Sequence, residues 1–175
     1  MLAPDQLVGE WTIEREVSDL RAGVTGKYAG ILRVSADDAG YRWDESGTLH
    51  WGDYTGAAER HLLLRRHEGD WWMCFADGRL FHPWQVGGEV VHPCVADVYR
   101  GRIEPGGSDE FMLTWDVTGP HKRQLIVSRM RRVQAPAASA TSTPSMPTSR
   151  ANARTAGGSA ASASAPVSTR GSVST

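Results

Sequence analysis

Three charged residues occupy positions where the sequence predicts side chains that point into an apolar interior. Alternate residues of a strand share one face, so Arg15 falls on the same face as Trp11 and Ile13. The same alternation places Glu45 and Arg60 among aromatic and aliphatic residues. Burying such charges costs several kcal/mol each unless they are paired or hydrated. Their placement therefore indicates either a pairing network or a hydrated site.

Both explanations remain open from the sequence. An internal Arg–Glu network could fix the register of the strands and have no further role. Alternatively, these residues line a water-filled lumen in which two arginines outnumber one glutamate. Such a lumen favours a carboxylate or another anionic head group, which arginine binds through two parallel hydrogen bonds.

A second group of polar residues suits acid–base chemistry. Arg79 and His82 follow a predicted central turn, while His92, Asp97 and Tyr99 belong to a later predicted strand. If these strands pair, His82 approaches His92 and Asp97, and a His–Asp pair can act in general acid–base catalysis. A histidine beside tryptophans is also typical of a hydrogen-bonded core or rim residue. His82, His92 and Asp97 are therefore candidate catalytic residues only if the protein is an enzyme.

The sequence gives little support for metal or cofactor chemistry. His82, His92 and Cys94 are suitable donor types, but their spacing along predicted strands is not that of a zinc site. The last predicted strand offers no histidine to a haem, and only His121 lies in the turn before it. Neither a Gly-x-Ser-x-Gly motif nor a phosphate-binding P-loop is present. We expect no metal and no cofactor.

Short strands separated by turns must position these residues. The clearest signal is the hairpin between Trp71 and Trp84, in which Asp77-Gly78 predicts a type I′ turn. Further strands are predicted at Leu7–Val17, Lys27–Ser35, Tyr41–Trp51, Ala57–His67, Glu89–Arg100, Phe111–Thr118 and Gln124–Arg132. These make about nine strands, and only Ser18–Gly26 could contain a short helix. Sequential hairpins favour an all-β, up-and-down antiparallel barrel, which also removes exposed edges.

One end of the predicted barrel has its own signature. Gly9-Glu-Trp11 lies on the first strand, and Arg129, Arg131 and Arg132 lie on the last, which neighbours the first in a closed barrel. A guanidinium stacked over Trp11 would combine burial with a cation–π contact. This pattern resembles the calycin superfamily of lipocalins and fatty-acid-binding proteins. The resemblance implies a structural role for Trp11 and for Arg129 or Arg131.

Five motifs spread over residues 7–131 carry a closer resemblance. They are Gly9-x-Trp11, Glu45-x-Gly47, Phe75-x-Asp-Gly-Arg-x-Phe-His82, His92-x-Cys94-x-x-Asp97-x-Tyr99 and Trp115-x-Val117-x-Gly-Pro120-x-Lys122. With them the chain is similar to a family of small calycin-like proteins from bacteria and fungi that is known only as a domain of unknown function. The resemblance implies a fold and no established activity.

Composition sets the limits of the folded domain. The chain has 175 residues and a formal net charge of −1, which gives no electrostatic basis for binding nucleic acid or an anionic membrane. We expect a barrel domain over residues 2–133. From Gln134 onward the chain is rich in Ala, Ser, Thr and Pro and too poor in apolar residues to fold, so we expect a disordered tail. The N-terminus does not resemble a signal peptide, and Cys74 and Cys94 suit buried reduced thiols, so we expect a cytoplasmic protein.

Three functional hypotheses follow. The first is a binding protein, without enzymatic activity, that holds a small, partly apolar, anionic ligand in its lumen. The predicted ligand-binding residues are Arg15, Glu45, Arg60, Arg79, His82 and Tyr99. The second is an isomerase or hydrolase that uses His and Asp residues at the barrel mouth, and the third is a structural or interaction barrel with a filled core. A cavity of a few hundred Å3 beside the interior charges would favour the first hypothesis. The sequence leaves the ligand and the oligomeric state open.

Overall fold

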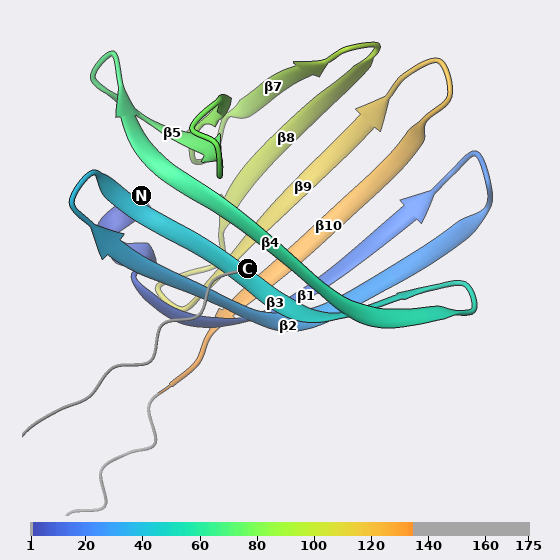
Figure 1. The fold of residues 1–175 in the computed structure, drawn as a ribbon, viewed down its shortest axis with the longest axis horizontal. Helices are drawn as coiled ribbons and strands as arrows, with labels where there is room; N and C mark the ends of the chain where they lie inside the picture. The colour runs from blue at the N-terminus through green and yellow to red at the C-terminus, as the bar shows by residue number, and fades with distance from the viewer. Residues whose placement is uncertain (1, 135–175) are drawn as a thin grey trace, which may run out of the picture. The chain divides into compact units, whose positions relative to one another are not determined.

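One curved sheet of ten antiparallel strands forms the fold (Figure 1). The structure is a computed structural model, and it describes residues 2–134. A 3-10 turn, η1 (Pro4–Leu7), precedes the strands β1 (Gly9–Asp19), β2 (Val24–Asp37), β3 (Gly40–Trp51), β4 (Tyr54–His67), β5 (Asp70–Phe75), β6 (Leu80–Pro83), β7 (Glu89–Cys94), β8 (Asp97–Pro105), β9 (Glu110–Thr118) and β10 (Arg123–Arg132). Their order in the sheet is β6-β5-β4-β3-β2-β1-β10-β9-β8-β7. The predicted all-β, up-and-down antiparallel barrel is therefore confirmed, and residues 20–23 form a turn between β1 and β2 instead of a helix.

The first and last strands pair with each other, while β6 and β7 meet through side chains. Within residues 2–134, no ladder of backbone hydrogen bonds joins β6 to β7. The ring of Phe81 on β6 instead lies 4.8 Å from the ring of His92 on β7, centroid to centroid. Phe75 on β5 lies 5.9 Å from the same His92 ring. Aromatic contacts thus span the seam between the two free strand edges.

The strand count differs from the prediction because Glu89–Arg100 contains two strands. β7 ends at Cys94 and β8 begins at Asp97. Between them Val95 has a φ of 57°, a left-handed conformation that a β-branched residue rarely adopts. No glycine marks this turn, so the alternation continues through it without a visible break. Pro93 was the available sign, since proline cannot donate to a ladder and is confined to edge strands or strand ends.

The central hairpin forms where it was predicted, but its turn is not type I′. A type I′ turn needs positive φ at both central residues, and only Gly78, with φ 85°, meets this condition. The Gly78 amide donates to the Phe75 carbonyl at 2.9 Å, and the Phe75 amide donates to the Arg79 carbonyl at 2.9 Å. This pattern is that of a three-residue loop that ends in a left-handed glycine.

Aromatic side chains fill the end of the barrel beneath η1. Trp11, Trp43 and Phe111 are buried. Trp11 and Trp43 both contact Phe111, with ring centroids 4.9 and 6.1 Å apart. The Trp11 indole Nε1 donates to the Leu7 carbonyl at 2.8 Å, which ties η1 to this end. The interior is therefore solid at the η1 end.

Arg132 stacks over Trp11, with its guanidinium carbon 4.0 Å from the ring centroid. It is the cross-strand partner of Trp11, and it also donates to two backbone carbonyls of the segment before β1, at 2.5 and 3.1 Å. The prediction that Arg129 or Arg131 stacks on Trp11 was wrong. Both are exposed, because the alternation of β10 turns them to the outer face.

Several expectations concern regions at or beyond the limits of the described residues. The predicted disordered tail lies outside them apart from Gln134, so the tail and the domain boundary at residue 133 stay predictions. Within residues 2–134, no helix is long and apolar enough to cross a membrane.

Cys74 is buried as expected, but Cys94 at the end of β7 is exposed, which corrects the expectation of two buried thiols.

Candidate ligand-binding site in the barrel lumen

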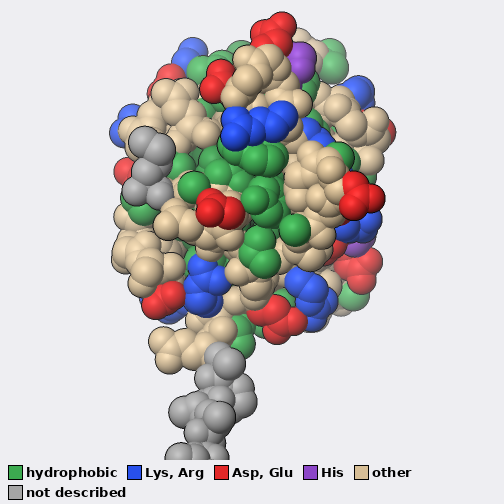
Figure 2. Space-filling model, turned by 90° about the vertical axis from the view of Figure 1, so that its left-hand side faces the viewer, with side chains coloured by type: hydrophobic (Ala, Val, Ile, Leu, Met, Phe, Trp, Pro, Cys, Tyr) green, Lys and Arg blue, Asp and Glu red, His purple; other side chains and the backbone are tan. Residues whose placement is uncertain are grey.

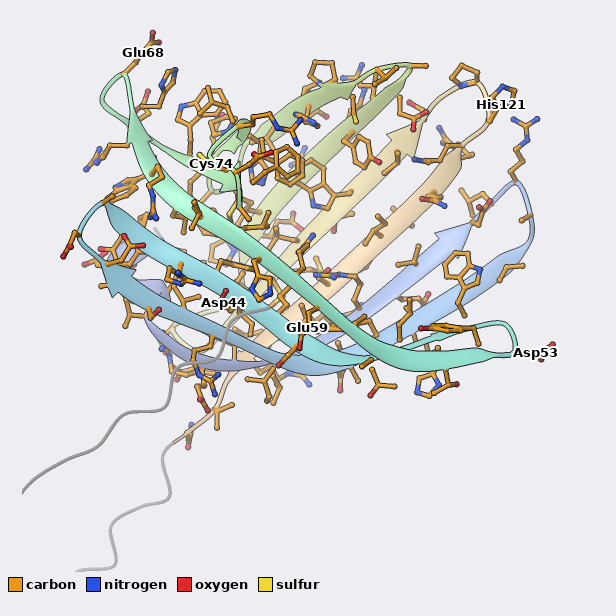
Figure 3. All side chains as sticks on the ribbon, viewed as in Figure 1. Asp44, Asp53, Glu59, Glu68, Cys74 and His121 are labelled. Carbon is orange, nitrogen blue, oxygen red and sulfur yellow. The ribbon has the colours of Figure 1, made fainter. Side chains whose placement is uncertain are left out.

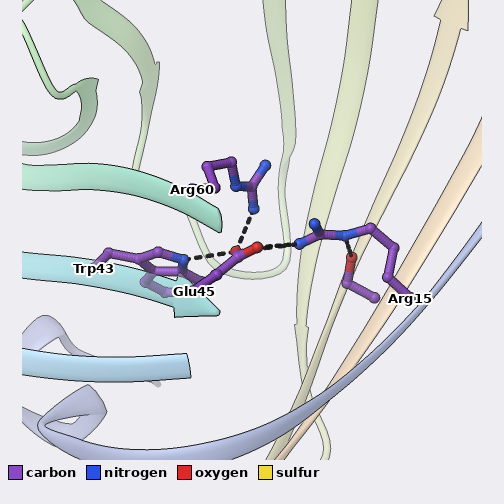
Figure 4. Close-up of polar contacts among 5 residues, drawn as sticks. Arg15, Trp43, Glu45 and Arg60 are labelled. Atoms are coloured by element: carbon purple, nitrogen blue, oxygen red, sulfur yellow. Dashed lines mark hydrogen bonds and ion pairs between the residues drawn. The ribbon is translucent and has the colours of Figure 1, made fainter. Parts of the chain in front are cut away.

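Arg15, Glu45 and Arg60 converge inside the barrel, as the strand alternation predicted (Figure 4). Nη2 of Arg15 donates to both oxygens of the Glu45 carboxylate, at 2.9 and 3.1 Å. Arg60 is the cross-strand partner of Glu45, and its Nη2 donates to Oε1 of the same carboxylate. Trp43 Nε1 also donates to Oε1, at 2.8 Å, and Arg15 Nε donates to the Ser128 hydroxyl at 2.7 Å. The carboxylate, 2% exposed, is thus surrounded by donors.

The strand register separates this cluster from the outer surface. Asp44 and Glu59 each adjoin a member of the cluster in sequence, yet they belong to the outer face (Figure 3). There the Asp44 carboxylate lies 2.7 Å from Nδ1 of His61. Because a shift of one residue would exchange the two faces of a strand, the register fixes which charges enter the lumen.

The cluster carries one more positive than negative charge. Burial alone would raise the pKa of Glu45, but the attraction of Arg60 and Arg15 and the hydrogen bonds outweigh burial, so the pKa is lowered and the carboxyl is ionised. Burial and the nearby Arg60 lower the pKa of Arg15, although a guanidinium keeps its proton in proteins. Arg60 Nε is buried without a hydrogen-bond partner among the described residues. An unpaired buried donor costs about 1–3 kcal/mol, so an acceptor placed beside it would be stabilising.

A cavity of about 240 Å3 lies beside the cluster. Its polar wall consists of Arg15, Arg60 and Ser128, from β1, β4 and β10. The remaining lining is Val17, Trp43, Phe81, Tyr99, Leu113, Trp115, Ile126 and Met130. A few convergent polar groups on an otherwise apolar surface are typical of small-molecule sites, which usually measure about 300–1,000 Å3. The lumen therefore offers a small site with a polar wall and an apolar remainder.

Gly101 determines where the Trp115 ring lies. The two residues are cross-strand partners on β8 and β9, and a Cβ atom at Gly101 would lie 2.5 Å from Cζ3 of Trp115. The indole therefore rests against the backbone of β8. Phe81 stacks on it, with ring centroids 5.3 Å apart and an angle of 18° between the planes. Any side chain at position 101 would displace the indole from this position.

The candidate catalytic residues do not form a His–Asp pair. Asp97 pairs with Lys122, with Oδ2 and Nζ 2.8 Å apart, and no hydrogen bond within residues 2–134 joins it to a histidine. His82 is 1% exposed, and its Nδ1 donates to the Pro83 carbonyl at 2.8 Å. Burial, with smaller contributions from His92 and Arg60, lowers the pKa of His82 from 6.5 to about 4. His82 is thus a neutral core histidine, and this geometry gives the enzyme hypothesis no support.

The structure separates the other two predicted ligand-binding residues. Arg79 is exposed at the hairpin turn, where its Nε donates to Asp77 at 2.8 Å and its guanidinium lies 5.2 Å from the centroid of the Phe75 ring. It does not line the lumen cavity, so its predicted role in binding a lumen ligand is not supported. Tyr99 does line the cavity, and Lys122 Nζ donates to its hydroxyl oxygen at 3.4 Å.

The sequence reasoning missed most of the apolar wall. Phe81 and Trp115 lie within motifs that carry the family resemblance, but they were treated only as part of the fold. The relation of Trp115 to Gly101 becomes visible only when the pairing of β8 with β9 is known. Ser128 left a weak signal, because it is a small polar residue at an inward position between Ile126 and Met130.

A larger groove lies outside the lumen, on the side of the molecule that Figure 2 shows. It measures about 790 Å3, and its lining includes Leu2, Trp71 and Trp84, with Arg66 and Asp70 among its charged residues. Hydrophobic side chains gather in the middle of this face with charged ones around them (Figure 2). None of the residues predicted from sequence as site residues lines this groove, so size alone does not make it the better candidate.

Residues 2–134 contain no group of three or more His, Cys, Asp or Glu side chains placed to hold a metal ion. The expectation that the protein uses neither a metal nor a cofactor stays a prediction.

Comparison of sequences places the chain in a family. The family described as "Family of unknown function (DUF6314)" matches residues 7–132, and the chain belongs to it. No curated protein matches the sequence. The expected membership of a family of unknown function is confirmed.

Comparison of structures finds other β-barrels. An S-type phycobiliprotein lyase from Guillardia theta is 13% identical with a TM-score of 0.55, over 76% of this chain and 92% of that one. A redesigned β-barrel, mFAP1, bound to DFHBI is 12% identical with a TM-score of 0.39, over 75% of this chain and 100% of that one. A protein of unknown function of the DUF3598 family from Nostoc punctiforme is 14% identical with a TM-score of 0.44. The match covers 76% of this chain and 50% of that one. The likeness to the lyase supports the barrel fold and nothing beyond it.

Proposed function

We propose that this member of the family binds a small, partly apolar anion inside its barrel, with Arg15 and Arg60 holding the negative charge. The observation that carries the proposal is the cavity of about 240 Å3 lined by both arginines. The two guanidiniums share one buried carboxylate, so a single positive charge beside the cavity has no partner within the cluster. An anion in the cavity would neutralise that charge.

The same geometry weighs against the two alternatives. A barrel with a filled core would leave no cavity beside the charges, whereas here a cavity of about 240 Å3 lies beside them. An enzyme that used His82 with Asp97 would need the two within hydrogen-bond reach, whereas Asp97 pairs with Lys122. The lyase and the other barrels provide no argument about the ligand, so the proposal rests on the residues of this lumen.

Calorimetric titration tests the proposal with acids and their uncharged counterparts. We expect benzoate to bind to the wild-type protein and benzamide to bind at least about tenfold more weakly, because a hydrogen bond to a charged group contributes about 1.5–3 kcal/mol. Affinity for the acid should fall as salt is added, since the interaction is electrostatic. Equal binding of acid and amide, or no binding of benzoate, heptanoate or hexadecanoate at millimolar concentration, would contradict the proposal.

A matched pair of variants locates the site. Arg60→Gln removes one of the two lumen guanidiniums and should weaken benzoate binding about tenfold or more. Arg33→Gln is the control, because Arg33 is 61% exposed and pairs with Glu10 on the outer face. The control should bind benzoate as the wild type does. Equal losses in both variants would show that the effect is not specific to the lumen.

A further inference from the structure

We infer that the ligand is a planar aromatic monocarboxylate, no larger than a fused bicyclic ring, taken whole into the lumen. This inference rests on the proposed function and adds the chemical class of the ligand to it. It combines the volume of the cavity, the placement of its aromatic side chains and the size of its charge excess.

The volume limits the ligand to a small molecule. At about 30 Å3 for each water of the liquid, 240 Å3 holds on the order of eight water molecules. A ligand of roughly ten non-hydrogen atoms therefore fills the space at the density of a protein interior. A long-chain fatty acid is larger than this volume, so part of its chain would have to lie outside the cavity.

The aromatic residues lie opposite the arginines across the barrel. In the ring of ten strands, β4 stands opposite β9 and β1 stands opposite β6. Arg60 and Arg15 thus face the strands that carry Trp115 and Phe81. A carboxylate at the arginine side places the rest of the ligand against these rings.

The ring surfaces form a continuous wall. Phe81 stacks on Trp115, and Tyr99 meets Trp115 edge to face with ring centroids 6.4 Å apart. All three line the cavity. Aromatic pairs in stacked or edge-to-face contact contribute about 0.5–1.5 kcal/mol beyond the burial of their area, so this wall favours a ring over an aliphatic chain of equal size.

The charge excess favours a monoanion. Two guanidiniums against one carboxylate leave one positive charge, and His82 is neutral inside the fold. The pair Asp97–Lys122 at the Tyr99 side adds no net charge. A single carboxylate therefore balances the lumen, whereas a dianion would bury an uncompensated negative charge.

Titration of the full-length wild-type protein with matched acids tests the class. Benzoate and heptanoate have the same number of non-hydrogen atoms and the same carboxylate, so they differ in the ring alone. We expect benzoate to bind several-fold to about tenfold more tightly than heptanoate. Naphthoate should bind at least as tightly as benzoate, and hexadecanoate should bind more weakly than heptanoate. Tighter binding of heptanoate or hexadecanoate than of benzoate would overturn the aromatic class but leave the anion site intact. No binding of any of these acids would overturn the proposed function as well.

Two variants connect the preference to the aromatic wall. Phe81→Leu should reduce the affinity for benzoate about three- to tenfold and change the affinity for heptanoate less than about twofold. Tyr54→Leu is the control, since Tyr54 is 57% exposed at the start of β4 and does not line the cavity. An equal loss for both acids in Phe81→Leu would show that the wall does not select rings. The comparison of acids on the wild type remains decisive if Phe81→Leu does not fold.

Discussion

Among single substitutions in the lumen cluster, removal of the Glu45 carboxylate at its centre should destabilise the folded protein most. Glu45→Leu leaves the guanidiniums of Arg15 and Arg60 without their shared partner. Arg15 is the more serious case because its side chain is only 15% exposed, and Trp43 Nε1 also loses its acceptor. Breaking a buried ion pair from one side costs about 3–5 kcal/mol. This is a large fraction of the 5–15 kcal/mol that stabilises an ordinary domain.

Removing Arg60 should cost much less. Glu45 keeps both hydrogen bonds from Arg15, and the Arg60 side chain is 40% exposed. We expect about 1 kcal/mol for Arg60→Met, as for a partly solvated pair. The double variant Arg60→Met with Glu45→Leu should remain as unstable as Glu45→Leu, because Arg15 still has no partner. Adding Arg15→Met should recover stability, since the buried charges are then removed as a set.

Urea unfolding at neutral pH, followed by far-ultraviolet circular dichroism, measures these free energies. The slope with urea should stay constant across the variants if the unfolded states are comparable. Two results would refute the reasoning: a cost below about 1 kcal/mol for Glu45→Leu, or no gain in stability when Arg15→Met is added to the double variant. Either would mean that water already hydrates the charges in the fold.

Three further predictions concern His82, Gly101 and Arg132. The folded protein holds the pKa of His82 down to about 4 from 6.5, so the unfolded chain binds its proton first and the wild type should lose about 3 kcal/mol of stability as the pH falls across that range. His82→Asn should remove most of this loss in urea titrations, and an unchanged loss would show that other groups cause it. Gly101→Ala should displace Trp115 and weaken benzoate binding several-fold in calorimetry, because the new Cβ would lie 2.5 Å from the indole; unchanged affinity would show that the ring does not shape the cavity. Arg132→Met should cost about 1–3 kcal/mol through its contacts with Trp11 and the backbone, whereas Arg131→Met on the outer face should stay within about 0.5 kcal/mol, and equal effects would contradict the stacking.

The alternation of strands was enough to identify the lumen charges. Arg15, Glu45 and Arg60 stand out because a period of two assigns each to an apolar face, and a buried charge needs a partner. The same logic predicted an antiparallel barrel, since every turn signal joins strands that follow each other in sequence. These features are local or depend only on the order of the strands.

Features that depend on exact register could not be read in the same way. Arg132 differs from the predicted Arg131 by one position, and one position is the whole difference between the two faces of a strand. The extra turn at Val95 has no glycine, and its left-handed backbone is maintained by the hairpin that surrounds it. Sequence could propose Asp97 as a partner for histidine, but the β8–β9 pairing and the turn before β10 bring Lys122 to it instead.

The cavity itself is a matter of volume and could not be predicted from residue types. The same aromatic residues could have filled the lumen. They leave about 240 Å3 because Trp115 lies down against Gly101 and Phe81 stacks on it, which keeps both rings close to the wall. The space in this lumen thus depends in part on Gly101, whose partner Trp115 lies on the next strand.

A crystal structure of the protein soaked with a bromobenzoate would test the central claim most directly, since bromine can be located without ambiguity. We predict the acid in the lumen, with a carboxylate oxygen about 2.7–2.9 Å from Arg60 or Arg15 and the ring against Phe81 and Trp115. Bromobenzoate in the outer groove beside Trp71 and Trp84, with the lumen occupied only by water or side chains, would contradict the assignment of the site.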